Sequence, residues 1–321
     1  MPAIDEVLTR WMPVGQWRRV MVTGGAGFVG SHLCDALVET GIDVLCVDNF
    51  STGSHQNISP LRSRNNFHLV EADVTVGVGT HLPVDAILHA ASPASVVDFY
   101  LSPERSLSAL STGILTTLAY AQRHRARFVL ISAAEATNDK NHLGEGDPTD
   151  PVELYRLARR FAESITANAR SLMGADTCVV RLYSTFGPRM REDAGFVLPE
   201  LVRQALNRVP VTVAGSGSKL VPLCYIADVV SGVLAAAMHP VPGPVEIGST
   251  GGVPLAALAQ RVIDVAGSTS PINFSPYALH APAPIADTVL ARELLGWTCR
   301  VSLEDGLATT IQAMREANSV A

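Results

Sequence analysis

The stretch that decides the fold is RVMVTGGAGFVGSHL, at residues 19–33. It opens with a short apolar run, rich in β-branched residues, that is typical of a buried strand. Three glycines follow at intervals of three residues, and they are Gly24, Gly27 and Gly30. Such glycines permit a tight strand-to-helix turn, a close approach of backbone amides to a diphosphate, and close packing of the helix on a sheet. The helix that opens here would also present free N–H groups and partial positive charge to phosphates.

An acidic residue supports this interpretation. A second apolar run, at residues 42–48, is predicted to be the next strand and ends at Asp48. A carboxylate in this place can accept hydrogen bonds from the adenosine ribose. Residues 49–52 contain no Lys or Arg that could pair with a 2′-phosphate, so the sequence favours NAD over NADP. The alternative is that Asp48 only ends a strand at a turn.

The composition is that of a globular protein. The chain has 321 residues, of which 47% are hydrophobic and 17% charged, which is enough for a large core and two lobes. A net charge of −6 without any basic run argues against a nucleic-acid partner. We find neither a membrane-spanning stretch nor a secretory signal, and therefore expect a cytoplasmic protein.

The cysteines are odd in number and widely spaced, and none forms a C-x-x-C pair. They predict buried thiols in a reducing compartment, with no disulfide framework and no zinc or other metal site. The five are Cys34, Cys46, Cys178, Cys224 and Cys299.

Strands and helices alternate along the first half of the chain. Further strands are expected at residues 67–71, 85–90, 128–132 and 177–182, with helices at residues 29–39, 104–124 and 152–171. This alternation predicts an α/β fold with a Rossmann-type, doubly wound parallel sheet and right-handed crossovers.

The pattern is less regular after residue 183. A strand is expected at residues 211–213, and helices at residues 198–207, 226–238, 254–266, 286–295 and 303–318. We predict an N-terminal extension at residues 1–18 and an NAD-binding domain at residues 19–183 plus about 221–248. Residues 184–220 plus 249–321 would form a smaller C-terminal substrate lobe.

Ligands bind at the carboxyl edge of such a sheet, so the chemistry is sought there. Three segments are candidates: HAASPAS at residues 89–95, SAAEAT at residues 132–137, and Tyr155 with Arg159 one helical turn later. We expect His89 to lie at a buried strand end.

Several ordered segments together resemble the extended short-chain dehydrogenase/reductase family, and in particular its sugar-nucleotide epimerases and UDP-glucuronate decarboxylases. They are VTGGAGFVGSHL at 22–33, VDNFSTG at 47–53, HAASPAS at 89–95, GPRM at 187–190, VAGSGS at 213–218 and LLGW at 294–297. The resemblance implies that NAD⁺ takes a hydride from a sugar carbon. It also implies that a Tyr takes the hydroxyl proton, assisted by a Ser or Thr and by a Lys four residues after the Tyr.

The catalytic positions depart from that family pattern. Tyr155 is retained, but Ala133 replaces the Ser or Thr and Arg159 replaces the Lys. Arg remains cationic but cannot shuttle a proton, and loss of a preorganised donor costs about 10²–10³ in rate. Glu135, which corresponds to a residue near the carboxylate in the decarboxylases, is the third predicted catalytic residue.

The resemblance also extends to the ligands. It implies NAD contacts at Gly24, Gly27, Phe28, Val29, Gly30, Asp48, Asn49, Asp73, Val74, Ala90, Tyr155 and Arg159. Ser92, Ser95, Ala133 and Ser184 are predicted to line the substrate pocket, although Ser92 and Ser95 could instead only cap the following turn.

The positions that grip a nucleotide diphosphate in the family are changed as well. The two family arginines align with Val221 and Pro284, and an Asn aligns with Ser184. Each lost charge-assisted contact would cost about 1.5–3 kcal/mol. We therefore expect a sugar or sugar-derivative substrate other than a conventionally bound UDP-sugar.

Three functions stay open. The first is an NAD-dependent epimerase, decarboxylase or dehydrogenase. The second is an NAD-binding regulatory or scaffold protein with little redox turnover, and the third is non-redox chemistry with structural NAD. An apolar helical face (Leu107, Leu110, Ile114, Leu115 and Leu118) either pairs with the Tyr155 helix in a homodimer, as in the family, or packs in the core.

Overall fold

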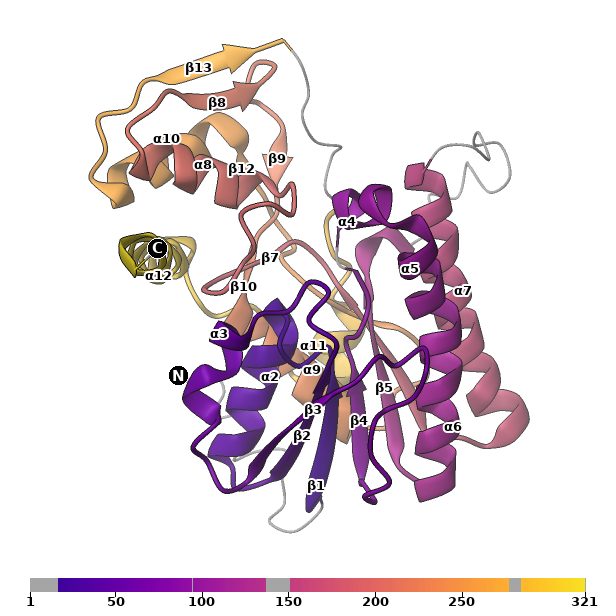
Figure 1. The fold of residues 1–321 in the computed structure, drawn as a ribbon. Helices are drawn as coiled ribbons and strands as arrows, with labels where there is room; N and C mark the ends of the chain where they lie inside the picture. The colour runs from indigo at the N-terminus through magenta and orange to yellow at the C-terminus, as the bar shows by residue number, and fades with distance from the viewer. Residues whose placement is uncertain (1–16, 94, 137–150, 277–283, 321) are drawn as a thin grey trace.

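A seven-stranded parallel sheet forms the centre of the molecule (Figure 1). The computed structural model describes residues 17–93, 95–136, 151–276 and 284–320. The strand order is β11-β6-β5-β4-β1-β2-β3, which confirms the predicted doubly wound sheet. The strands are β1 (Arg19–Thr23), β2 (Asp43–Asp48), β3 (Phe67–Glu71), β4 (Ala86–His89), β5 (Arg127–Ala133), β6 (Thr177–Leu182) and β11 (Val245–Ile247).

Helices cover both faces of this sheet (Figure 1). One layer contains α2 (Phe28–Glu39), α9 (Ile226–Met238) and α11 (Val289–Leu295). The other contains α5 (Pro103–Ser108), α6 (Ile114–His124) and α7 (Pro151–Met173). Successive residues of β1 point into the two layers: Val20 and Val22 belong to one buried cluster and Met21 to the other. This double burial explains the continuous apolar strands.

The expected helix at residues 104–124 is present but is not α-helical throughout. A π-helical segment, η2 (Ala109–Gly113), lies between α5 and α6. Inside it, the Ser111 hydroxyl donates to the carbonyl of Leu107 at 2.6 Å. A π segment widens the helix locally, which a uniform 3.6-residue period does not reveal.

A second group of elements lies beyond the carboxyl edge of the sheet (Figure 1). Strand β8 (Val211–Ala214) pairs in parallel with β13 (Ile272–Ser275). Strand β8 packs on α8 (Val197–Leu206), and both strands pack on α10 (Leu255–Ala266). Shorter elements complete the fold: α3 (His55–Ile58), η1 (Ser59–Leu61), α4 (Val96–Leu101), η3 (Ala134–Ala136), β7 (Thr185–Phe186), β9 (Leu220–Val221), β10 (Cys224–Tyr225), β12 (Val253–Pro254) and α12 (Leu303–Val320).

Two elements of this region differ from the prediction. Strand β13 was not predicted, because its four residues are all partly or fully exposed and carry no strong apolar signal. Helix α11 begins at Val289 and not near residue 286. Asp287 ends the preceding segment, since its carboxylate accepts a hydrogen bond from the Val289 amide at 3.2 Å.

The cysteine prediction needs one correction. Four of the five thiols are buried, but Cys299 is exposed. It lies in the irregular segment between α11 and α12, where residues 298–300 are all exposed. Among the described residues, we find no helix that is long and apolar enough to cross a membrane.

Candidate functional site

The glycine turn between β1 and α2 has no space for larger residues. Gly24 has a φ of +68°, and a Cβ on it would lie 2.6 Å from the carbonyl oxygen of Ala90. A Cβ on Gly30 would lie 2.1 Å from the carbonyl oxygen of Gly24. Gly24 therefore packs against the end of β4, and the start of α2 packs directly on this turn, in line with the close helix–sheet packing that the sequence predicts.

The first turn of α2 suits a phosphate group. Gly27 is its N-cap, no side chain caps it, and its first turn has no acidic residue. Phe28 and Val29 are only partly buried, so their amides are available to an anion, which the helix dipole also favours. These residues fit the diphosphate of NAD.

Asp48 supports the turn from the end of β2. Its carboxylate accepts hydrogen bonds from the amides of Ala26 and Phe50, both at 2.8 Å. Burial raises the pKa of Asp48, and these backbone hydrogen bonds oppose that rise. Each carboxylate oxygen keeps a second lone pair, so holding the turn and accepting from a ribose hydroxyl are compatible.

Asp73 and Asn49 lie together beside this turn. The Asn49 side-chain amide donates to Asp73 at 2.9 Å, and Asp73 also accepts from the amide and hydroxyl of Thr75. These bonds, led by that of the Thr75 hydroxyl, lower the pKa of Asp73. The adjacent Val74 is buried. The segment thus forms a fixed rim after β3.

Tyr155 and Arg159 form the centre of the candidate catalytic site. Arg159 Nε donates to Tyr155 Oη at 3.1 Å. The other guanidinium nitrogens donate to the Ser92 hydroxyl at 2.9 Å and to the carbonyl of Pro93 at 2.7 Å. Both side chains are nearly inaccessible, at 1% and 4% exposure, and the ring of Phe99 packs edge-on against Tyr155.

The loop after β4 therefore connects the two halves of the site. Ala90 contacts Gly24 of the cofactor turn, and Ser92 contacts Arg159. This places the Tyr155 pair at the edge of the sheet where the glycine turn lies. The sequence predicted each piece, but not that Arg159 joins them.

His89, at the end of β4, contributes a buried neutral side chain. Its Nδ1 lies 2.9 Å from the Thr23 hydroxyl, and its Nε2 is buried without a hydrogen-bond partner among the described residues. Burial lowers its pKa to about 3, and the Arg159 cation acts in the same direction. The expected buried strand end is confirmed.

The remaining predicted site residues are distributed around this centre. Ala133 is half-buried at the end of β5, and Ser184 is half-buried beside β7. Ser95 accepts a hydrogen bond from the Asp98 amide at 3.0 Å and so caps α4, the second of its two predicted roles. The side chain of Glu135 lies outside the described residues.

Sequence reasoning missed two supports of the site. Phe99 shields Tyr155, and Asp98 pairs with Arg191 at 2.9 Å, which ties α4 to the segment after β7. Both contacts join distant parts of the chain, so no local spacing marks them. At the two positions that the resemblance aligns with phosphate-binding arginines, Val221 is half-buried in β9 and Pro284 is exposed.

Comparisons with known proteins agree with this geometry. Residues 20–248 match the model of the NAD dependent epimerase/dehydratase family. UDP-glucuronic acid decarboxylase 1 of Arabidopsis thaliana is 34% identical over 315 residues, covering 95% of this chain and 72% of the relative. The protein of the same name from Danio rerio is 35% identical, with 92% and 72% covered.

Solved structures show the same fold. UDP-glucose 4-epimerase with UDP-glucose from Thermotoga maritima superposes with a TM-score of 0.81 at 26% identity, covering 94% of this chain and 99% of that one. UDP-glucuronic acid 4-epimerase from Bacillus cereus, solved with UDP-glucuronic acid and NAD, gives 0.80 at 22% identity, with 93% and 99% covered. The chain belongs to the NAD-dependent epimerase/dehydratase family, and its cofactor is NAD.

Proposed function

We propose that this protein is an NAD-dependent sugar-modifying enzyme that acts through oxidation of a secondary alcohol. The observation that carries the proposal is the 3.1 Å hydrogen bond from Arg159 to Tyr155 Oη, beside the glycine turn. NAD, when bound, supplies the hydride acceptor. Tyr155 takes the proton of the substrate hydroxyl, and the Arg159 cation stabilises the negative charge on the phenolic oxygen.

The substrate we propose is a sugar derivative that is not held as a conventional UDP-sugar. The decarboxylase relatives are named for UDP-glucuronic acid, but Val221 and Pro284 offer no cation to a diphosphate. We assign substrate contacts to Ser92, Ala133 and Ser184, and an auxiliary acid–base role to Glu135. We also propose that residues 184–220 and 249–321 form the substrate lobe.

A second candidate is an NAD-binding protein with little redox turnover. It is favoured by the 1% exposure of Tyr155 and by the engagement of Arg159 with Ser92 and Pro93. In addition, Ala133 cannot donate a hydrogen bond to a reacting oxygen.

The test measures NADH formation and product release with UDP-glucuronic acid and a panel of free sugars and polyols. We expect slow turnover in the wild type and a loss of turnover in Tyr155→Phe. In Ala133→Ser, turnover should rise by about 10²-fold, because the missing donor is restored. Full activity of Tyr155→Phe would refute the assignment. NAD binding without turnover in both the wild type and Ala133→Ser would support the second candidate.

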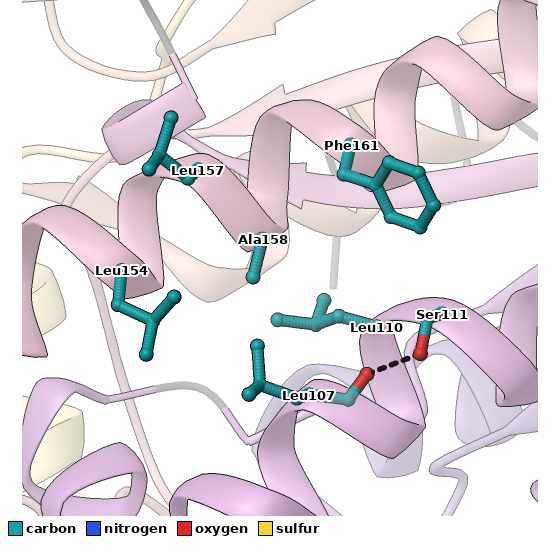
Figure 2. Close-up of a pocket in the computed structure, with 7 residues that line it drawn as sticks. All are labelled: Leu107, Leu110, Ser111, Leu154, Leu157, Ala158 and Phe161. Atoms are coloured by element: carbon teal, nitrogen blue, oxygen red, sulfur yellow. Dashed lines mark hydrogen bonds between the residues drawn. The ribbon is translucent and has the colours of Figure 1, made fainter. Parts of the chain in front are cut away.

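We further propose a homodimer built on the outer face of α7. A groove of about 280 Å³ separates η2 and its neighbours from α7, and Figure 2 shows Leu107, Leu110, Ser111, Leu154, Leu157, Ala158 and Phe161 lining it. Leu157 and Phe161 are 46% and 51% exposed. Leu157 and Phe161 lie within one helical turn of Ala158, which lines the groove. The helical spacing places them on a different face of α7 from Tyr155 and Arg159. The groove is therefore separate from the catalytic site.

A further inference from the structure

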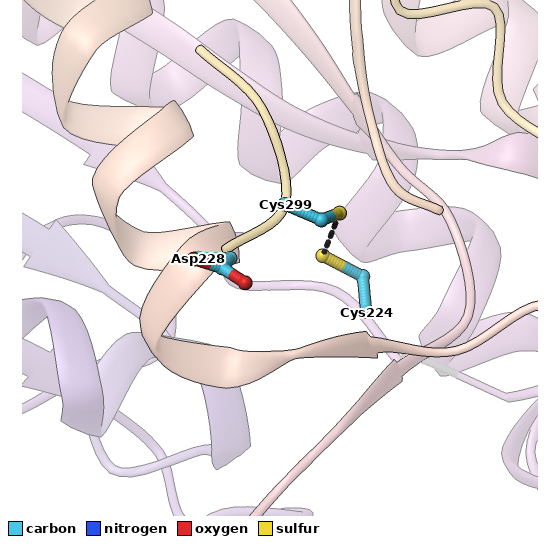
Figure 3. Close-up of side chains that lie close together, drawn as sticks. All are labelled: Cys224, Asp228 and Cys299. Atoms are coloured by element: carbon cyan, nitrogen blue, oxygen red, sulfur yellow. Dashed lines mark hydrogen bonds between the residues drawn. The ribbon is translucent and has the colours of Figure 1, made fainter. Parts of the chain in front are cut away.

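Two cysteines that are distant in sequence meet at the base of α9. The sulfur atoms of Cys224 and Cys299, 75 residues apart, lie 3.2 Å from each other (Figure 3). Cys224, in β10, is 1% exposed, whereas Cys299 is exposed. A buried thiol is therefore in contact with one that solvent can reach.

The chain on both sides of Cys299 is fixed to α9, the helix that follows Cys224. Asp228 Oδ2 accepts hydrogen bonds from the amides of Arg300 and Val301, both at 2.9 Å. On the other side, the Trp297 indole donates to the carbonyl of Asp228 at 2.9 Å. The two sulfur atoms are thus held together by anchors outside the pair itself.

We propose that Cys224 and Cys299 are a redox-active thiol pair that closes to a disulfide when the protein meets a small disulfide oxidant such as oxidised glutathione. The sulfur atoms would move from 3.2 Å to about 2.05 Å. Because Asp228 already holds the surrounding backbone, side-chain rotation supplies most of this movement.

The reaction proceeds in two exchanges. The Cys299 thiolate attacks one sulfur of oxidised glutathione, which forms a mixed disulfide between Cys299 and that glutathione and releases the other glutathione as a thiolate. Cys224 then loses its proton, attacks the Cys299 sulfur and releases the second glutathione. The two protein thiols lose two protons and two electrons in total, and the oxidant becomes two molecules of glutathione.

Asp228 is placed to accept the proton from Cys224. One of its carboxylate oxygens lies within 4.8 Å of both sulfur atoms. Its Oδ1 is buried and has no hydrogen-bond partner in the described part of the chain. The Cys299 contact and burial raise the pKa of Cys224, and burial raises that of Asp228. The buried thiol therefore needs such a nearby base, and the exposed Cys299 is the first to react.

A second thiol pair provides an internal control. A Cβ built on Gly25 would lie 2.6 Å from the Cys46 sulfur and 3.2 Å from the Cys34 sulfur, so both sulfurs flank the same residue. Both of these cysteines are 0% exposed. An oxidant in solution can reach Cys299 but not this pair, which should remain reduced in the folded protein.

The experiment treats the folded, reduced protein with oxidised glutathione, blocks free thiols under denaturing conditions, and maps tryptic peptides by mass spectrometry. Cleavage after Arg292 and Arg300 separates the Cys299 peptide from that of Cys224. We expect a cross-linked Cys224–Cys299 peptide, free Cys34 and Cys46, and a rise in Tm that dithiothreitol reverses. After the same glutathione treatment, the Cys299→Ser variant should show neither the cross-link nor the Tm shift. Because residue 299 is exposed, this substitution should leave folding intact.

Two results would overturn the proposal. One is a persistent glutathione adduct on Cys299 with Cys224 still free. The other is stoichiometric zinc that co-purifies with the protein and protects both thiols, since Asp228 and the two sulfurs could also hold a thiophilic ion. Asp228→Asn keeps an acceptor oxygen for the Arg300 and Val301 amides, so this variant should still fold. It lacks the base, so its Cys224–Cys299 disulfide should form more slowly than in the wild type.

Discussion

At the scale of single residues, two buried histidines should make the stability of this protein depend on pH. Burial lowers the pKa of His89 to about 3, and burial together with the Arg189 cation lowers that of His32 to about 4. His89 ends β4 beside the Tyr155 pair, and His32 Nε2 lies 3.0 Å from the carbonyl of Pro188. Both imidazoles are therefore neutral in the folded protein at neutral pH.

We predict that the free energy of unfolding falls as the pH falls from 6.5 towards 4. The unfolded chain binds protons at both histidines in this range, whereas the folded chain does not, so protonation favours the unfolded state. Each histidine contributes a slope of about 1.4 kcal/mol per pH unit. The stabilisation is complete above pH 6.5, the ordinary histidine pKa, and is lost below it. Urea unfolding at a series of pH values measures the slope.

A matched pair of variants separates the histidine effect from that of the buried acids. Burial raises the pKa of acids such as Asp48 and Asp228, so their protonation on acidification favours the folded state. His89→Gln should flatten the slope by about one histidine's share, while His81→Gln, at an exposed position, should not. If His89→Gln folds poorly, NMR titration of the wild type replaces it. A His89 ring signal that titrates near pH 6.5 would contradict the prediction.

Some contacts of the candidate site could be predicted from the sequence, and others could not. Tyr155 and Arg159 could be paired from the sequence because a spacing of four residues places them on one helix face. The contacts of Arg159 with Ser92 and Pro93 could not, because they depend on how α7 packs against the loop after β4. The exposure of Cys299 likewise follows from the path of an irregular segment.

At the scale of elements, the strand–turn–helix unit of β1 and α2 is the part that the sequence predicts best. Gly30 is required by a short contact with Gly24 inside the unit, and Gly24 by its positive φ, so a local pattern carries this information. In contrast, β13 and the start of α11 depend on neighbours elsewhere in the fold, and both were missed or misplaced. The π segment η2 is a third local deviation that periodicity does not encode.

We predict that Gly30→Ala disrupts this unit and weakens NAD binding. A Cβ there would lie 2.1 Å from the backbone oxygen of Gly24, a clash that only movement of α2 away from β1 can relieve. We expect a stability loss of about 1–3 kcal/mol and at least a tenfold weaker affinity for NAD, measured by thermal unfolding and calorimetry. Gly27→Ala, with a contact of 3.2 Å, should cost less.

The matched control is Gly251→Ala, because a Cβ on Gly251 meets nothing within 4 Å. This variant should bind NAD as the wild type does. Retention of wild-type NAD affinity in Gly30→Ala would show that the turn does not hold the cofactor as proposed.

At the scale of the whole molecule, the apolar face expected from residues 107–118 divides between two roles. Leu110, Ile114 and Leu118 are buried in the core, whereas Leu115 is 54% exposed. The sequence left core packing and dimer pairing open, because both produce the same periodicity. The structure assigns the buried members to the core and leaves Leu115, Leu157 and Phe161 exposed on the surface of the α6–α7 layer.

The homodimer proposal predicts that charge on this surface separates the subunits. Each large apolar side chain that becomes buried contributes about 1.5–3 kcal/mol, and an aspartate at such a position would have to be desolvated without a partner. We therefore expect the double variant Leu157→Asp/Phe161→Asp to be monomeric by light scattering while retaining NAD affinity. Phe274→Asp, in β13 of the separate group of elements beyond the sheet edge and 54% exposed, should remain dimeric. A wild type that is monomeric at micromolar concentration would contradict the homodimer. A double variant that stays dimeric would exclude α7 as the interface, since the two introduced carboxylates would then face solvent in the assembly.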